Sequence, residues 1–185
     1  MNRQAAFDLM CQYTANESLR RHMLSVELAM RAYAEHFKKD VEKWGIVGLL
    51  HDFDYEQNPE PPNHPLVGAK ILAEQGYPED VIYAIKSHVD MVDNCPRVSQ
   101  LDKTLFAVDE LCGFITAVAL MRPTGIVGMK AKSVRKKMKT KSFAEKVSRD
   151  DITNGAAELD LDLNEHIQFV IDALVPHAEQ LLLIK

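Results

Sequence analysis

The amino-acid sequence predicts an all-α protein that folds as a compact helical bundle. Apolar residues recur every three or four positions along most of the chain, which is the spacing of amphipathic helices. No segment shows the strict alternation of a half-buried strand, and the stretches between the helical patterns are short. The chain of 185 residues is long enough for one substantial core, so we expect a single domain over residues 1–185.

The first two expected helices have clear N-terminal signals. Asn16 is a suitable N-cap, and apolar residues follow it at helical spacing as far as Phe37. Asp40 is a suitable N-cap for the next helix, whose apolar face carries Gly48 and leads to His51. The second helix therefore ends near a histidine and a carboxylate that stand side by side, His51 and Asp52.

The next segments alternate between proline-containing loops and short helices. Residues 55–63 contain three prolines and predict a surface loop (Pro59, Pro61 and Pro62). Pro65 suits the first turn of a helix that Gly76 ends. Pro78 then restarts a helix that runs to His88, and a polar loop over residues 90–97 follows it.

Ser99 begins the most apolar helix of the chain, which we expect to cross the core and to end before Pro123. Gly125 and Gly128 mark a turn after it. The basic segment 130–141 follows, with an apolar stripe at helical spacing (Ala131, Val134 and Met138).

The C-terminal part is expected to hold two more helices. Asp150 or Asp151 is the candidate N-cap of the first, and Asn164 that of the second. Pro176 should kink or split the last helix, because its ring is incompatible with a regular helix interior.

Composition and charge narrow the class of protein. The formal net charge of −5 argues against nucleic-acid or anionic-membrane binding by the whole surface. The N-terminus lacks the apolar region of a signal peptide, and no apolar run approaches the roughly 18 residues of a membrane span. The three cysteines are widely spaced and suggest neither a disulfide framework nor a thiolate zinc site. We therefore expect a cytoplasmic protein without stable nucleic-acid or membrane partners.

Four polar residues lie on apolar helix faces: His22, His51, His88 and Asp109. Asp109 stands out, because its helical neighbours are apolar and an unpaired ionised carboxylate in a core costs several kcal/mol. A basic partner, protonation or a metal ion could each relieve this cost. A divalent metal would explain all four residues together, since imidazole nitrogens and carboxylate oxygens are its usual ligands.

The adjacent pair His51 and Asp52 could serve one metal only at the end of a helix. Neighbouring side chains in a regular helix diverge by about 100°, whereas a fraying last turn allows both to face one point. Each histidine taken singly fits an ordinary core or surface residue. The set as a whole predicts a metal centre.

These residues also resemble a known family. The order of His22, His51-Asp52 and Asp109 in an all-helical chain resembles the HD domain superfamily of metal-dependent phosphohydrolases. The segments HPLVGAKIL at 64–72 and KSHVD at 86–90 are similar to the histidine-bearing segments of HD proteins with two metals. The resemblance covers about residues 16–118 and leaves about 124–185 as a C-terminal helical extension.

The resemblance implies a set of ligands and marks a departure. A first metal would be bound by four residues and a second by three, with Asp52 as the bridge (His22, His51, Asp52 and Asp109; Asp52, His64 and His88). One or two divalent ions are implied, from among Mn, Fe, Co, Ni, Mg and Zn. Phe53 and Asp54 replace the Ile-Gly of the common His-Asp-Ile-Gly signature, and Tyr55 stands where the nucleotidase branch carries a glutamate. The branch of the superfamily is therefore not indicated.

The implied activity is hydrolysis of a small phosphate ester, for which a nucleotide is one candidate and both monoesters and diesters remain open. Asp52 is a candidate catalytic residue, and His88 or Asp54 could protonate the leaving group. Candidate substrate-binding residues are basic, although a basic run is also typical of a solvated helix face (Arg21, Lys132 and Lys136). The alternatives are a non-catalytic HD module that binds metal or ligand in signalling, and an HD di-iron oxygenase. We expect a monomer or a homodimer.

Overall fold

The computed structural model describes residues 1–60 and 62–184, and over these residues the chain is all-α, with nine α-helices, a short 3₁₀ helix and no strand. The predicted fold class is confirmed. Pro61, one of the three prolines of the predicted loop, lies outside the described residues.

Contacts divide the chain into two units, Met1–Phe106 and Ala107–Lys185. Helix α6, Gln100–Met121, begins in the first unit and continues into the second. The single domain expected from the sequence stays a prediction.

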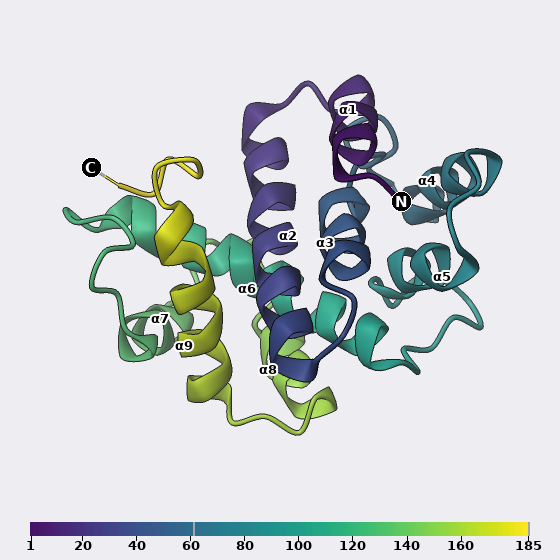
Figure 1. Cartoon of the computed structure of the whole chain (residues 1–185). Coiled ribbons are helices and arrows are strands. Elements are labelled where there is room, and N and C mark those ends of the chain that lie inside the picture. The colour runs from purple at the N-terminus through teal and green to yellow at the C-terminus, as the bar shows by residue number, and fades with distance from the viewer. Residues whose placement is uncertain (61, 185) are drawn as a thin grey trace. The chain divides into compact units, whose positions relative to one another are not determined.

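The first unit opens with three packed helices: α1 (Arg3–Tyr13), α2 (Glu17–Phe37) and α3 (Val41–Leu50). Figure 1 shows α2 and α3 side by side, with α1 against α3. The predicted caps are confirmed, because the Asn16 and Asp40 side chains accept hydrogen bonds from first-turn N–H groups. The sequence predicts no helix before Asn16, so α1 is a helix that was not expected.

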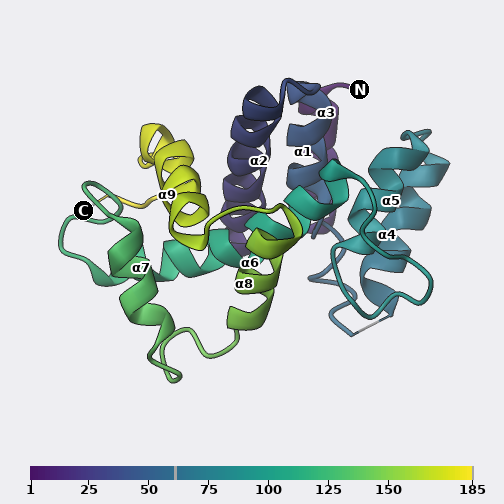
Figure 2. The ribbon, with the colours of Figure 1, turned by 90° about the horizontal axis from the view of Figure 1, so that it is seen from below.

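The other helices of the first unit are α4 (Asn63–Glu74) and α5 (Glu79–Ser87), which lie side by side in Figure 2. The backbone of His64 is extended, with φ −82° and ψ 130°, so regular helix starts at Pro65 as expected. Gly76 adopts a φ of +77°, a conformation that favours glycine, just after the end of α4. Pro78 then precedes α5, as predicted.

Helix α6 starts one residue after Ser99 and ends two residues before Pro123, close to the predicted bounds. Ser99 and Asp102 cap its first turn reciprocally: the Ser99 N–H donates to Asp102 Oδ2 at 2.8 Å, and the Asp102 N–H donates to Ser99 Oγ at 3.2 Å. By length and composition alone α6 could cross a membrane, but 61% of its most apolar stretch is buried in the protein. A buried core helix passes the same test, so α6 is weak support for a span.

The second unit continues with α7 (Ala131–Met138), α8 (Arg149–Glu158), α9 (Leu163–Leu174) and the 3₁₀ helix Val175–His177. Pro176 lies in that 3₁₀ helix, which confirms the expected break of the last helix.

Two predicted caps in this unit are wrong. Ser148 caps α8 by accepting from the Asp151 N–H, and Asp162 caps α9 by accepting from the Asn164 and Glu165 N–H groups. Asp150 and Asp151 instead stand in the first turn of α8, where a carboxylate favours the helix dipole. Several good capping residues stand close together at both places, and side-chain spacing does not distinguish among them.

The burial of His166 predicts that the stability of the second unit falls at acidic pH. The residue is buried and its Nε2–H donates to the Ala107 carbonyl at 2.9 Å. Burial lowers the pKa of His166, and the hydrogen bond to Ala107 offsets this only in part. The unfolded chain takes up the proton near pH 6.5, whereas the native protein does so only at lower pH. The unfolded state therefore binds more protons in this window, and stability should fall as pH falls.

The measurement is urea unfolding of metal-free protein between pH 7.5 and 5.5, for the wild type and His166→Gln. We expect the free energy of unfolding of the wild type to fall more steeply below about pH 6.5 than that of the variant. Contributions from the other histidines cancel in the difference. Parallel pH curves would show that His166 does not titrate differently in the two states.

Candidate metal centre

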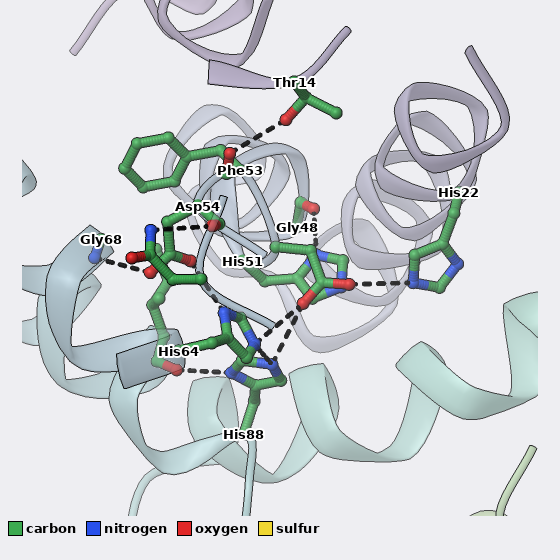
Figure 3. Close-up of polar contacts among 12 residues, drawn as sticks. Thr14, His22, Gly48, His51, Phe53, Asp54, His64, Gly68 and His88 are labelled. Atoms are coloured by element: carbon green, nitrogen blue, oxygen red, sulfur yellow. Dashed lines mark hydrogen bonds and ion pairs between the residues drawn. The ribbon is translucent and has the colours of Figure 1, made fainter. Parts of the chain in front are cut away.

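The first unit brings five of the predicted site residues together from four helices. His22 lies in the second turn of α2, His51 and Asp52 follow the last residue of α3, His64 precedes the regular part of α4, and His88 directly follows α5. Figure 3 shows the rings of the four histidines converging. Because α3 ends at Leu50, His51 and Asp52 can face one point, as the sequence argument required.

Asp52 is the centre of this arrangement. Its Oδ2 lies 3.8 Å from His22 Nε2 and 3.5 Å from His51 Nε2. Its Oδ1 lies 3.2 Å from His64 Nε2 and 3.5 Å from His88 Nε2. The residues thus form two groups with metal-ligand spacing that share Asp52, each with its ligand atoms within 4.8 Å of one another (His22, His51 and Asp52; Asp52, His64 and His88).

Hydrogen bonds at Nδ1, on the side of the ring away from Asp52, fix the tautomers of three histidines. His51 Nδ1 lies 2.8 Å from the Gly48 carbonyl, and His88 Nδ1 lies 2.5 Å from the Ile85 carbonyl. A carbonyl only accepts hydrogen bonds, so each of these Nδ1 atoms carries a proton and donates. His64 Nδ1 faces a carboxylate in the same way, Oδ1 of Asp54 at 2.8 Å. Neutral rings held like this present Nε2 lone pairs to the cluster, the usual orientation of metal-binding histidines.

The cluster needs positive charge. His64 Nε2 and His88 Nε2 lie 3.4 Å apart, and both face the same Asp52 oxygen. Lone pairs and a carboxylate at these distances repel one another unless protons or a cation lie between them. The donor set of imidazole nitrogens and a shared carboxylate therefore fits a divalent metal.

The pKa shifts of Asp52 and His64 also indicate that the cluster favours positive charge. Burial raises the pKa of Asp52, but the charge of His51 and hydrogen bonds from three histidines outweigh this and hold the pKa well below its usual range (His51, His64 and His88). Burial lowers the pKa of His64, but hydrogen bonds to Asp52 and Asp54 outweigh it and raise the pKa to about 9. The site stabilises protons when no metal is bound, and a bound cation would take their place.

The centre is buried on one side and open on the other. His51, His64 and His88 are buried, whereas the side chains of His22 and Asp52 are 21% and 15% exposed. The open side is where water or a substrate could reach a bound ion.

Among the other predicted residues, Asp54 contacts His64, whereas four residues belong to neither ligand group (Asp109, Arg21, Lys132 and Lys136). Asp109 is half-buried on the part of α6 that belongs to the second unit, and its role as a ligand stays a prediction. Arg21 contacts Ser18 and Glu17 on its own helix, with Nη2 3.2 Å from Ser18 Oγ. Lys132 and Lys136 are exposed on α7 in the second unit. The substrate-binding roles of these three basic residues stay predictions.

Sequence reasoning missed two supports of the centre. The Thr14 hydroxyl donates to the Phe53 carbonyl at 2.9 Å and anchors the turn that follows Asp52. The Gly68 N–H donates to Asp54 Oδ2 at 2.7 Å and ties the same turn to α4. The only available signal for the second was a carboxylate beside a strongly apolar residue, Phe53, in a turn.

Comparison with known proteins identifies a family and distantly similar solved structures. The HD domain family model matches residues 19–113, slightly more than half of the chain. A solved structure of a predicted HD superfamily hydrolase involved in NAD metabolism, from Clostridium acetobutylicum, is 19% identical, with 96% of this chain and 98% of that chain covered and a TM-score of 0.49. So distant a likeness says nothing about the activity of this chain. No curated protein matches it.

Proposed function

The chain belongs to the HD domain family, and from this premise we propose that it is a metal-dependent phosphohydrolase acting on a small phosphate ester. The observation that carries the proposal is Asp52, whose two carboxylate oxygens each face two imidazole Nε2 atoms. Imidazole nitrogens and a carboxylate are the donors that would hold divalent cations here.

The roles of the residues follow from their positions. His22 and His51 would hold one cation with Asp52, and His64 and His88 would hold the other. A divalent cation bound there would lower the pKa of its bound water from about 15.7 toward 7 and would also polarise a phosphoryl oxygen of the ester. His22 and Asp52 are the more exposed members, so we place the ester on their side of the cluster.

The candidate acids are not equally suited to protonating a leaving group. Both carboxylate oxygens of Asp54 already accept hydrogen bonds, from His64 and from Gly68. His88 directs Nε2 at Asp52 while its Nδ1 donates to Ile85. These contacts favour a supporting role for Asp54 and a ligand role for His88.

The donor set also bears on the metal. Imidazole nitrogens suit Fe²⁺, Ni²⁺ and Zn²⁺, whereas Mg²⁺ and Mn²⁺ prefer oxygen ligands such as Asp52. The partial exposure of His22 and Asp52 favours an open, catalytic site over a closed, structural one. The cytoplasmic location and the monomeric or homodimeric state stay predictions from the sequence.

The test is elemental analysis of protein purified without chelator, followed by hydrolysis assays with Mn²⁺, Co²⁺, Ni²⁺ or Mg²⁺. The substrates are nucleotides, p-nitrophenyl phosphate and bis-p-nitrophenyl phosphate, so that monoesterase and diesterase activities are separated. We expect bound metal and hydrolysis of at least one ester class. Bound metal without hydrolysis across the panel would favour the non-catalytic module, iron with a redox-dependent colour would favour the oxygenase, and absence of both metal and hydrolysis would refute the proposal.

A further inference from the structure

Asp54 is a buried carboxylate that the proposed reaction does not use. It stands two residues after Asp52 and is only 1% exposed. Its Oδ1 lies 2.8 Å from His64 Nδ1, and its Oδ2 accepts the Gly68 N–H at 2.7 Å. Figure 3 shows Asp54 between Gly68 and His64, on the side of the His64 ring that faces away from His88.

The two hydrogen bonds of Asp54 determine the tautomer and the ring orientation of His64. An ionised carboxylate only accepts, so one oxygen of Asp54 takes the Gly68 N–H and the other takes the Nδ1–H of His64. On the neutral ring that binds a metal, Nε2 of His64 then carries the lone pair, 3.2 Å from Asp52 Oδ1 and 3.4 Å from His88 Nε2. Asp54 thereby selects the tautomer and the ring orientation that a metal ligand needs.

Helix geometry does not supply this orientation by itself. His64 has an extended backbone and stands before the regular part of α4, so no preceding helical turn restricts its ring. The contact with Asp54 depends in turn on Gly68, one turn further along the helix. A Cβ at Gly68 would lie 2.8 Å from Asp54 Cγ and 3.0 Å from both carboxylate oxygens. Only glycine lets the carboxylate approach the α4 backbone this closely.

We propose that Asp54, held by the Gly68 N–H, is a positioning residue that makes His64 a ligand and so creates the cation site formed by Asp52, His64 and His88. The inference rests on the metal centre of the proposed function. It assigns Asp54 to one of the two groups only, because its carboxylate contacts His64 and the Gly68 N–H of α4, on the side of the cluster formed by Asp52, His64 and His88. Loss of Asp54 should therefore weaken the second cation and leave the first in place.

Two substitutions separate geometry from charge. In Asp54→Asn the single amide oxygen can satisfy either His64 or Gly68, and the NH₂ group faces the other donor. Gly68→Ala keeps every charge and polar group but pushes the Asp54 carboxylate away from its position. The matched control is Glu60→Gln, which removes the same charge from an exposed side chain in the same connection.

The measurement is calorimetric titration of metal-free protein with Co²⁺, with the visible Co²⁺ absorption recorded in parallel. We expect two ions in the wild type and in Glu60→Gln. Asp54→Asn and Gly68→Ala should both lower the affinity of one ion by about 10–100-fold, the usual cost of losing the partner of a ligating histidine. The other ion should bind as in the wild type, which also shows that the fold is intact.

The outcomes distinguish this inference from the proposed function. A wild type that binds no ion refutes both. Two ions bound with unchanged affinity by both variants overturn the role of Asp54 alone. Weaker binding in Asp54→Asn together with normal binding in Gly68→Ala means that only charge matters and also overturns positioning. Loss of both ions in either variant assigns Asp54 a general structural role instead.

Discussion

Asp52→Asn is expected to prevent binding of both cations and to lower kcat/KM for the hydrolysed ester by about 10³-fold. Asp52 is the one residue shared by the two ligand groups. An amide keeps the shape of the side chain. It places a neutral oxygen on one side and an NH₂ donor on the other, so neither side has an anionic ligand. Bound metal contributes several kcal/mol of transition-state stabilisation, and about 4 kcal/mol corresponds to 10³ in rate.

The measurement is metal content by elemental analysis together with kcat/KM at saturating Mn²⁺. Asp93→Asn, which removes an exposed carboxylate from the loop after α5, is the control and should match the wild type in both. Circular dichroism should show native helix content in both variants. Two ions retained by Asp52→Asn would remove Asp52 from the centre, and full metal loss with unchanged hydrolysis would refute metal-dependent catalysis.

The core of the centre could be predicted from the sequence because helical periodicity assigns side chains to faces. Helical spacing places His22 and His51 beside apolar stripes, and the structure brings both to Asp52. His64 gave no such signal, since it stands before its helix, and it was proposed only from the resemblance to the HD superfamily. Its distance of 3.2 Å from Asp52 Oδ1 comes from the packing of α4, which spacing along one helix does not describe.

The support of His64 could not be predicted for the same reason. Asp54 and Gly68 are 14 residues apart and meet only because the turn after α3 packs against α4. The boundary between the two units was also invisible in the sequence. It falls after Phe106 within α6, where the neighbouring residues Leu105, Ala107 and Val108 continue the apolar pattern and mark no change.

Gly48→Ala is expected to destabilise the protein by about 3 kcal/mol, at the upper end of the usual cost of overpacking. A Cβ at Gly48 would lie 2.9 Å from Glu27 Cα, Glu27 N and Val26 C. All three are backbone atoms of α2, so no side chain can rotate away, and α3 must move from α2. The energetic cost of that displacement exceeds the small gain in helix propensity that alanine brings.

The same displacement should reach the metal centre. His22 is carried by α2, while His51 and Asp52 follow α3, and His51 Nδ1 donates to the carbonyl of Gly48 itself. Separation of the two helices lengthens the distances within this group, so Gly48→Ala should also weaken the ion held by His22, His51 and Asp52. Urea unfolding of metal-free protein measures the first effect, and Mn²⁺ titration measures the second.

Gly113→Ala is the matched control, because it makes the same change within a helix at a position where the added Cβ meets no atom within 4 Å beyond the nearby backbone of its own helix. It should stabilise the protein by about 0.5–1 kcal/mol, the entropic advantage of alanine over glycine. The two glycines therefore predict opposite signs for one chemical change. A Gly48→Ala protein as stable as Gly113→Ala would mean that α2 and α3 do not approach at Gly48, and the ligand group that spans them would lose its structural basis.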